Sequence, residues 1–299
     1  MPRVSFTDLL QRLDQAVNFC QSLGLEATTG RFGLYRRHIT FLVKAVGQPP
    51  DADARARLEA STPEERHEWL VALSESLELA TITALLERYE LPGVREKLRF
   101  ALKGPSLPEK ERPGSGSNQA RDFLFELDMA AKLSQAGFHP ALGERPDLSC
   151  DVDGTTLFFE CKRPSSPKRV DERLKEARKQ LRTGLRQALP GKYGVIAMSL
   201  SKIYQPGDKL LIGPREEDLR NGLARDLGGL AESTRPTWAL WNGKDVVGIL
   251  FHIVTVAVSR DEDRVFLGQQ LTACPLADPR KAGGKAFLRL GQALQALAH

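Results

Sequence analysis

Cysteine is scarce in this sequence and forms no metal-binding pattern. The four cysteines, at positions 20, 150, 161 and 274, include no Cys-x-x-Cys pair and none of the spacings of a zinc finger. Scattered thiols without a secretion signal indicate a reducing compartment, and we expect the protein to be cytoplasmic. The sequence around these residues gives no support for thiol catalysis.

Long apolar runs are also lacking. No uninterrupted apolar stretch approaches the 18 or more residues that a membrane-spanning helix needs. The opening residues, MPRVSFTDLLQRLDQ, have no continuous apolar block of the kind found in signal peptides. We therefore expect no membrane partner. Hydrophobic residues still make up 41% of the 299 positions, so the chain can bury a sizeable core.

Charge is present in both signs but is unevenly distributed. The formal net charge is +5, yet the window from Lys162 to Lys192 holds eleven Lys or Arg and three acids and so carries +8. The rest of the chain therefore sums to −3. A basic run in isolation is as readily a solvated helix face as a surface for nucleic acid. Its neighbours along the chain, described below, favour nucleic acid.

Residues 1–103 have the periodicity of helices. Apolar residues recur at helical spacing over 6–17 and again over 39–46. The sequence TPEE at 62–65 is a strong helix start, because it supplies a capping hydroxyl, a first-turn proline and acids near the positive end of the helix dipole. We predict a helix from there to about Leu86 and a shorter one over 94–102.

A compositional break follows the helical part. The fifteen residues GPSLPEKERPGSGSN, 104–118, contain nine Gly, Pro or Ser and cannot build a core element. We therefore predict an all-helical N-terminal domain over 1–103, a linker over 104–117 and a second domain over 118–299.

Helix and strand signals alternate in the second domain. The patterns predict, in order, a helix over 120–138, strands over 138–142, 147–152 and 155–162, a basic helix over 172–189 and a buried strand over 193–200. A helix over 217–230, a hairpin of 246–258 with 264–273, and a terminal helix over 281–297 complete the pattern. The fold class is α/β (α+β), a mixed central sheet flanked by helices.

A tight turn gives one pair of strands a defined register. The dipeptide DG at 153–154 is the strongest short signal for a two-residue hairpin loop. If these are the loop residues, Val152 pairs with Thr155, and Asp147 lies directly opposite Glu160. Opposed residues share a face, with Cβ atoms about 4.5–5.5 Å apart. Two carboxylates so placed repel each other, and a divalent cation between them turns the repulsion into coordination.

Other charged residues lie near this pair. The two-residue period of a strand puts Lys162 on the same face as Glu160. Glu126 lies beside the apolar stripe of a helix, where a carboxylate is costly unless it is paired or metal-bound. Two alternatives remain open at this point: Asp147 or Glu160 forms an ordinary surface salt bridge with Lys162, or Asp151 replaces Asp147 as ligand.

The motifs resemble a known superfamily. FE at 125–126 on a helix, PD at 146–147 and ECK at 160–162 on the next strand are similar to the PD-(D/E)xK nucleases, which have the restriction-endonuclease-like fold. The order helix, three strands, helix, strand over 118–200 also resembles the core of that fold. The resemblance implies that Asp147 and Glu160 are catalytic metal ligands and that Lys162 is the catalytic lysine. It further implies that Glu126 and the backbone carbonyl of Cys161 belong to the metal shell.

This resemblance implies a metal-dependent nuclease that hydrolyses phosphodiester bonds with Mg²⁺, for which Mn²⁺ substitutes. We expect DNA rather than RNA as its partner. The residues expected to bind nucleic acid follow the lysine strand: Arg163, Lys168, Arg169, Arg173, Lys175, Arg178, Lys179, Gln180, Arg182 and Arg186. Many exonuclease-like members carry Tyr four residues after a Gln on this helix, and here Gly184 follows Gln180.

Several functional questions stay open from sequence. The alternative to a nuclease is a catalytically silent nucleic-acid-binding or scaffolding protein of the same fold. The N-terminal helical domain either selects substrate or binds a partner, which includes a second copy of the chain. His252 lies in an apolar strand and is expected in the core. Trp238 and Trp241 are expected to pack, with stacking on bases as the other option.

Overall fold

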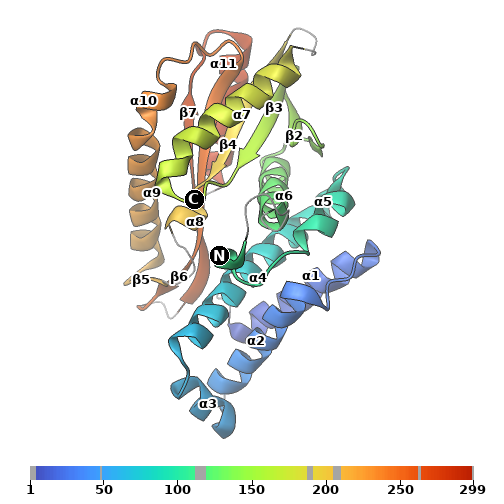
Figure 1. The fold of residues 1–299 in the computed structure, drawn as a ribbon, viewed down its shortest axis with the longest axis vertical. Coiled ribbons are helices and arrows are strands. Elements are labelled where there is room, and N and C mark those ends of the chain that lie inside the picture. Colours follow the sequence, from blue (N-terminus) through green and yellow to red (C-terminus); the bar gives the residue numbers. More distant parts are fainter. Residues whose placement is uncertain are drawn as a thin grey trace.

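The computed structural model describes residues 5–47, 49–111, 119–186, 191–204, 210–261 and 264–297. Within these ranges the chain forms eleven α-helices and one mixed sheet of seven strands, and the first six helices precede the sheet in the sequence (Figure 1). The predicted α/β class with a helical N-terminal region is thus confirmed.

The N-terminal helices begin at residues that satisfy their first amide groups. Ser5 and Thr62 each form a capping box, with Asp8 and Glu65 respectively. The helices are α1 (Phe6–Ser22), α2 (Gly30–Val46), α3 (Ala52–Glu59), α4 (Pro63–Tyr89) and α5 (Val94–Ala101). Helix α3 was not predicted, because it buries no residue and so has no apolar stripe in its sequence.

The sheet combines an antiparallel edge with a parallel centre. Its strands are β1 (Pro140–Leu142), β2 (Leu148–Val152), β3 (Thr155–Lys162), β4 (Lys192–Ser199), β5 (Leu211–Gly213), β6 (Val246–Ser259) and β7 (Arg264–Pro275). Strands β1, β2 and β3 pair antiparallel, β3, β4 and β6 pair parallel, and β7 is antiparallel to β6. The short β5, which was not predicted, pairs with the far end of β6.

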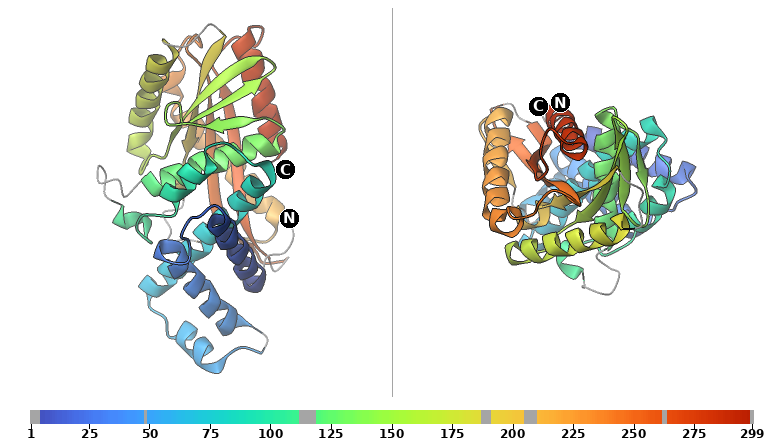
Figure 2. Two further views of the ribbon diagram at one scale, coloured as in Figure 1. Left: turned by 90° about the vertical axis from the view of Figure 1, so that its right-hand side faces the viewer. Right: turned by 90° about the horizontal axis from the view of Figure 1, so that it is seen from above.

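Helices cover both faces of the sheet (Figure 2). One face packs against α7 (Val170–Leu185), α9 (Glu216–Ser233) and the single turn α10 (Arg235–Trp238). The other packs against α6 (Gln119–Gln135) and α11 (Ala282–Ala296). A further short helix, α8 (Ser201–Tyr204), follows β4. The basic helix thus begins two residues before the predicted 172, and the end predicted at 189 lies outside the described residues.

Helix α6 joins the helical region to the sheet. Leu124 and Leu127 pack in a core shared with α1, α2, α4 and α5, whereas Phe125 and Met129 pack beneath the sheet. Arg121, at the start of α6, is buried and forms an ion pair of 2.6 Å with Glu75 of α4. Removing one partner of a buried ion pair costs about 3–5 kcal/mol, so this contact fixes the two parts together.

The first part of the predicted linker is bound to the folded chain. Leu107 is buried, and Glu111 forms ion pairs with Arg121 (2.8 Å) and with Lys202 of α8 (2.7 Å). The predicted linker residues 112–117 lie outside the described residues.

One helix of the described residues has the length and hydropathy of a membrane-spanning segment. It is α4, whose apolar run is interrupted by Glu75 and Glu78, and 67% of its most apolar window is buried inside the fold. The core helix of a soluble protein passes the same test.

Candidate active site at the end of the β2–β3 hairpin

The β2–β3 hairpin has the predicted register. Val152 pairs with Thr155, and Leu148 pairs with Phe159 at the other end of the ladder. Asp153 and Gly154 have φ angles of 53° and 76°, the two positive values that a type I′ turn requires. Asp147 directly precedes β2, next to the last paired residue, Leu148. Its Oδ2 accepts the backbone N–H of Cys161 in β3 at 2.7 Å.

Glu160 and Lys162 contact each other on β3. The Lys162 ammonium donates to Glu160 Oε1 at 2.7 Å, and Glu160 is only 7% exposed. Phe158, two residues earlier on the same face, packs in the core that contains α7. Glu160 and Lys162 therefore share one face of β3, as the two-residue period of a strand predicts, and α7 covers that face.

A lysine from the helical region meets the third carboxylate. Glu126 of α6 is buried and forms an ion pair with Lys97 of α5. Glu126 was expected in a metal shell, and in this structure its partner is an ammonium group. Lys97 was not predicted at the site, because nothing in residues 94–102 indicates that α5 lies beside α6 (Figure 1).

The carboxylates of the site hold their protons more tightly than isolated acids. Burial, opposed by the hydrogen bond from Cys161, raises the pKa of Asp147. Burial and the charge of Asp147 raise the pKa of Glu126 to about 8 and also raise that of Glu160. Burial lowers the pKa of Lys162, but Glu160 outweighs it, so the net pKa is raised. A group of buried acids that repel one another favours a cation.

These residues surround a cleft of about 700 Å³ between α5, α6, α7 and the end of the hairpin. Asp147, Glu126, Cys161 and Lys162 line it, whereas Glu160, the partner of Lys162, does not. The described lining carries five basic side chains (Lys97, Arg99, Lys162, Arg163 and Arg173) and six acidic ones (Glu96, Asp122, Glu126, Glu144, Asp147 and Glu176). The cleft is therefore not electropositive by itself.

The donor chemistry of the site suits a hard divalent cation. Carboxylate oxygens and a backbone carbonyl are the ligands that Mg²⁺ and Mn²⁺ prefer. Over the described ranges, however, no three His, Cys, Asp or Glu side chains converge closely enough to hold an ion. Glu126 is turned to Lys97, and Glu160 to Lys162. Metal binding by all three acids therefore requires these two lysines to move.

The residues expected to bind nucleic acid divide into three groups. Arg163 and Arg173 line the cleft, where they pair with Asp122 (3.7 Å) and Glu176 (2.5 Å). Arg178 lies over the ring of Trp241 at 4.6 Å, and Arg182 pairs with Asp245 at 3.1 Å. The remaining side chains are exposed on α7 or directly before or after it: Lys168, Arg169, Lys175, Lys179, Gln180 and Arg186.

Residues weighed as alternatives lie away from the cleft lining. Asp151 is exposed, and its Oδ1 accepts the N–H of Gly154 in the hairpin turn at 2.9 Å. His252 and Trp238 are buried, as expected for core residues.

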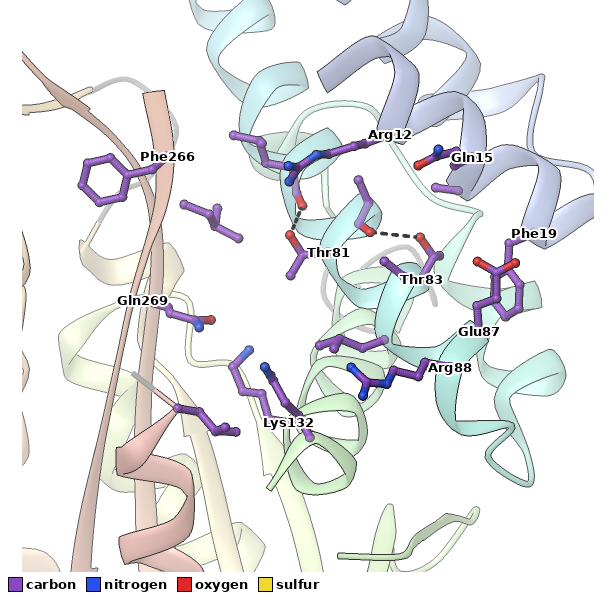
Figure 3. Close-up of a pocket in the computed structure, with 18 residues that line it drawn as sticks. Arg12, Gln15, Phe19, Thr81, Thr83, Glu87, Arg88, Lys132, Phe266 and Gln269 are labelled. Carbon is purple, nitrogen blue, oxygen red and sulfur yellow. Dashed lines mark hydrogen bonds between the residues drawn. The ribbon is translucent and has the colours of Figure 1, made fainter. Parts of the chain in front are cut away.

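A second cavity of about 430 Å³ lies between α1, α4, α6 and β7 (Figure 3). Arg12, Phe19 and Lys132 are among its lining residues, and none of the predicted site residues line it.

No protein-family model matches this sequence, and no curated protein is significantly similar to it. The function must therefore be inferred from the site itself.

Proposed function

We propose that this protein is a metal-dependent nuclease of the restriction-endonuclease-like, PD-(D/E)xK type, acting on DNA. One observation carries the proposal: Asp147 and Lys162 line one cleft from adjacent strands, with the backbone of Cys161 between them. A structural salt bridge needs one acid and one base. Such pairs account for Glu126 with Lys97 and for Glu160 with Lys162, but not for Asp147, a third carboxylate beside them that accepts the N–H of Cys161.

The roles follow from the positions of the side chains. Asp147, Glu160 and the carbonyl of Cys161 would hold Mg²⁺ or Mn²⁺, with Glu126 at its outer side. Bound metal of this kind lowers the pKa of a water ligand and neutralises charge on the phosphate. Lys162, once released from Glu160, places its ammonium where it orients the attacking water or stabilises the charge that develops on phosphate oxygens.

The balance of charge in the cleft suits a metal-dependent substrate. Six acids against five bases give the bare lining no attraction for a polyanion. Exposed basic residues on α7, such as Lys175 and Lys179, lie outside the cleft and can follow the phosphate backbone towards it. A divalent ion in the cleft reverses the sign of the lining, so metal and phosphate binding support each other.

The test is a cleavage assay on labelled single- and double-stranded DNA and on RNA, with and without Mg²⁺ or Mn²⁺. Wild-type protein cleaves only with metal. Asp147→Asn and Lys162→Met lower the rate at least about 100-fold, because each removes a group that acts at the reacting phosphate. Asp151→Asn, a matched carboxylate on the same hairpin outside the cleft lining, leaves the rate unchanged. Equal cleavage by all four proteins would overturn the proposal.

One observation favours the alternative of a silent binding protein. Lys97 and Lys162 already neutralise two of the carboxylates without a metal ion. If that arrangement is permanent, the protein binds nucleic acid in a salt-dependent manner and cleaves none under any divalent metal.

A further inference from the structure

The helical region contributes an aromatic surface to the acidic cleft. Phe100 of α5 and Phe123 of α6 both line the cleft, and their rings stack with centroids 5.0 Å apart at an angle of 27°. Phe100 is 37% exposed, which few large hydrophobic side chains of the described chain match. A phenylalanine needed only to attach α5 to α6 would be buried between them.

Cations accompany both rings. The Lys97 ammonium lies 4.9 Å from the centre of the Phe123 ring, and the Arg99 guanidinium lies 4.8 Å from that of Phe100. Glu96 pairs with Arg99 at 3.1 Å, so this guanidinium is held beside the ring. Phe100 is thus an exposed ring with a guanidinium beside it, and a base that carries phosphates on both sides suits both groups, stacking on the ring and pairing a phosphate with the cation.

The accessible ring selects for unpaired bases. Within a duplex the faces of each base are covered by its stacked neighbours, so a protein ring can stack only on a base that is single-stranded, terminal or extruded. We propose that Phe100, supported by Phe123, is a stacking platform for an unpaired nucleobase, and that the preferred substrate is single-stranded DNA or DNA with a single-stranded end.

This inference rests on the proposed function in one respect, since a base on the platform brings the adjoining phosphate into the cleft that holds Asp147 and Lys162. It assigns the helical region, through α5, to substrate selection. The alternative for this region, recruitment of another protein, makes no use of an aromatic ring inside the cleft.

The test measures binding rather than cleavage. Every protein carries Lys162→Met so that the probe survives, and fluorescence anisotropy follows a labelled single strand and a blunt duplex in Mn²⁺. Phe100→Ala is predicted to weaken single-strand binding about tenfold with little effect on the duplex, and Phe100→Trp to preserve it. Phe19→Ala is the matched control, a partly exposed phenylalanine of the helical region that lines the other cavity (Figure 3).

Quenching of 2-aminopurine placed along the single strand reports stacking directly, and Phe100→Ala is predicted to abolish the quenching. Equal losses for Phe100→Ala and Phe19→Ala, or equal losses on single strand and duplex, would overturn the platform. The experiments distinguish failure of one proposal from failure of the other. If the protein stacks bases but is not a nuclease, the binding results hold and no DNA is cleaved. If it is a nuclease without a stacking platform, DNA is cleaved but Phe100→Ala has no selective effect on single-strand binding.

Discussion

Three buried acids in this protein each pair with a lysine. Glu126 forms an ion pair with Lys97, and Glu160 forms one with Lys162. Within α6, Asp128 pairs with Lys132, which lies one turn after it. Isolated buried charges cost several kcal/mol each, so such pairing is expected at any interior acid. The acids of the cleft also lie close enough to raise one another's pKa, as Asp128 and Glu75 raise that of Glu78 outside the cleft. At the scale of residues, this repulsion marks the site only together with the cleft that Glu126, Asp147 and Lys162 line.

His252 provides a residue-scale test of burial. Its ring is 1% exposed and stacks on Phe125 at 5.9 Å, and among the described residues neither ring nitrogen has a hydrogen-bond partner. The charged groups that face it are Asp128, at 3.7 Å from Nδ1, and Lys132. Burial lowers the pKa of His252 from 6.5 to about 3, so the ring stays neutral in the folded protein.

The sign of the pH effect follows from this shift. Between pH 6.5 and about 3 the unfolded chain binds a proton at this histidine that the folded chain does not, so acidification destabilises the fold. The loss is at most about 1.4 kcal/mol per pH unit. His252→Leu is predicted to remove this part of the acid sensitivity, measured as the free energy of unfolding in urea at pH 6.5 and 5. The same pH slope in both proteins would contradict it.

At the scale of elements, the short loop before α5 sets how the helical region meets the cleft. Gly93 has a φ angle of +84°, and a Cβ there would lie 2.9 Å from the carbonyl oxygen of Leu142 in β1. Only glycine allows both the left-handed conformation and this approach. The loop thereby fixes α5, with Lys97 and Phe100, against the edge of the sheet.

Gly93→Ala is therefore predicted to displace α5. It should destabilise the protein by about 2–4 kcal/mol, from backbone strain and from the clash, and weaken single-strand binding. Gly137→Ala is the control, since Gly137 has nearly the same φ angle, +86°, and no atom within 4 Å of an added Cβ. It should cost about 1 kcal/mol and leave binding intact. Thermal unfolding and anisotropy measure both effects, and equal behaviour of the two variants would refute the role of the contact.

Elements with strong local signals were predictable from sequence. The type I′ turn at 153–154 determined the register of β2 and β3, and the apolar run over 193–200 identified β4 as a buried strand. Helix α3 and strand β5 were missed because their sequences have neither a clear apolar period nor sufficient length. Local patterns identify an element only where that element is long enough and buries at least one face.

At the scale of the whole molecule, the cleft is formed by segments far apart in sequence. Asp147 and Lys162 line it from one hairpin, and the turn with its register predicted that they lie near each other. Lys97 and Phe100 come from the helical region, and their place in the cleft depends on α6 packing with one side on the helices and the other on the sheet. No local pattern encodes that docking.

The central claim is that Asp147 and Glu160 jointly bind a divalent metal ion beside Lys162. Calorimetric titration with Mn²⁺ tests it most directly, because it requires neither a substrate nor cleavage. The account predicts one site in the wild-type protein, weakened at least about tenfold by Asp147→Asn and by Glu160→Gln, and unchanged by Asp151→Asn. Mn²⁺ binding that is unaffected by the first two substitutions, or no binding at all, would contradict it.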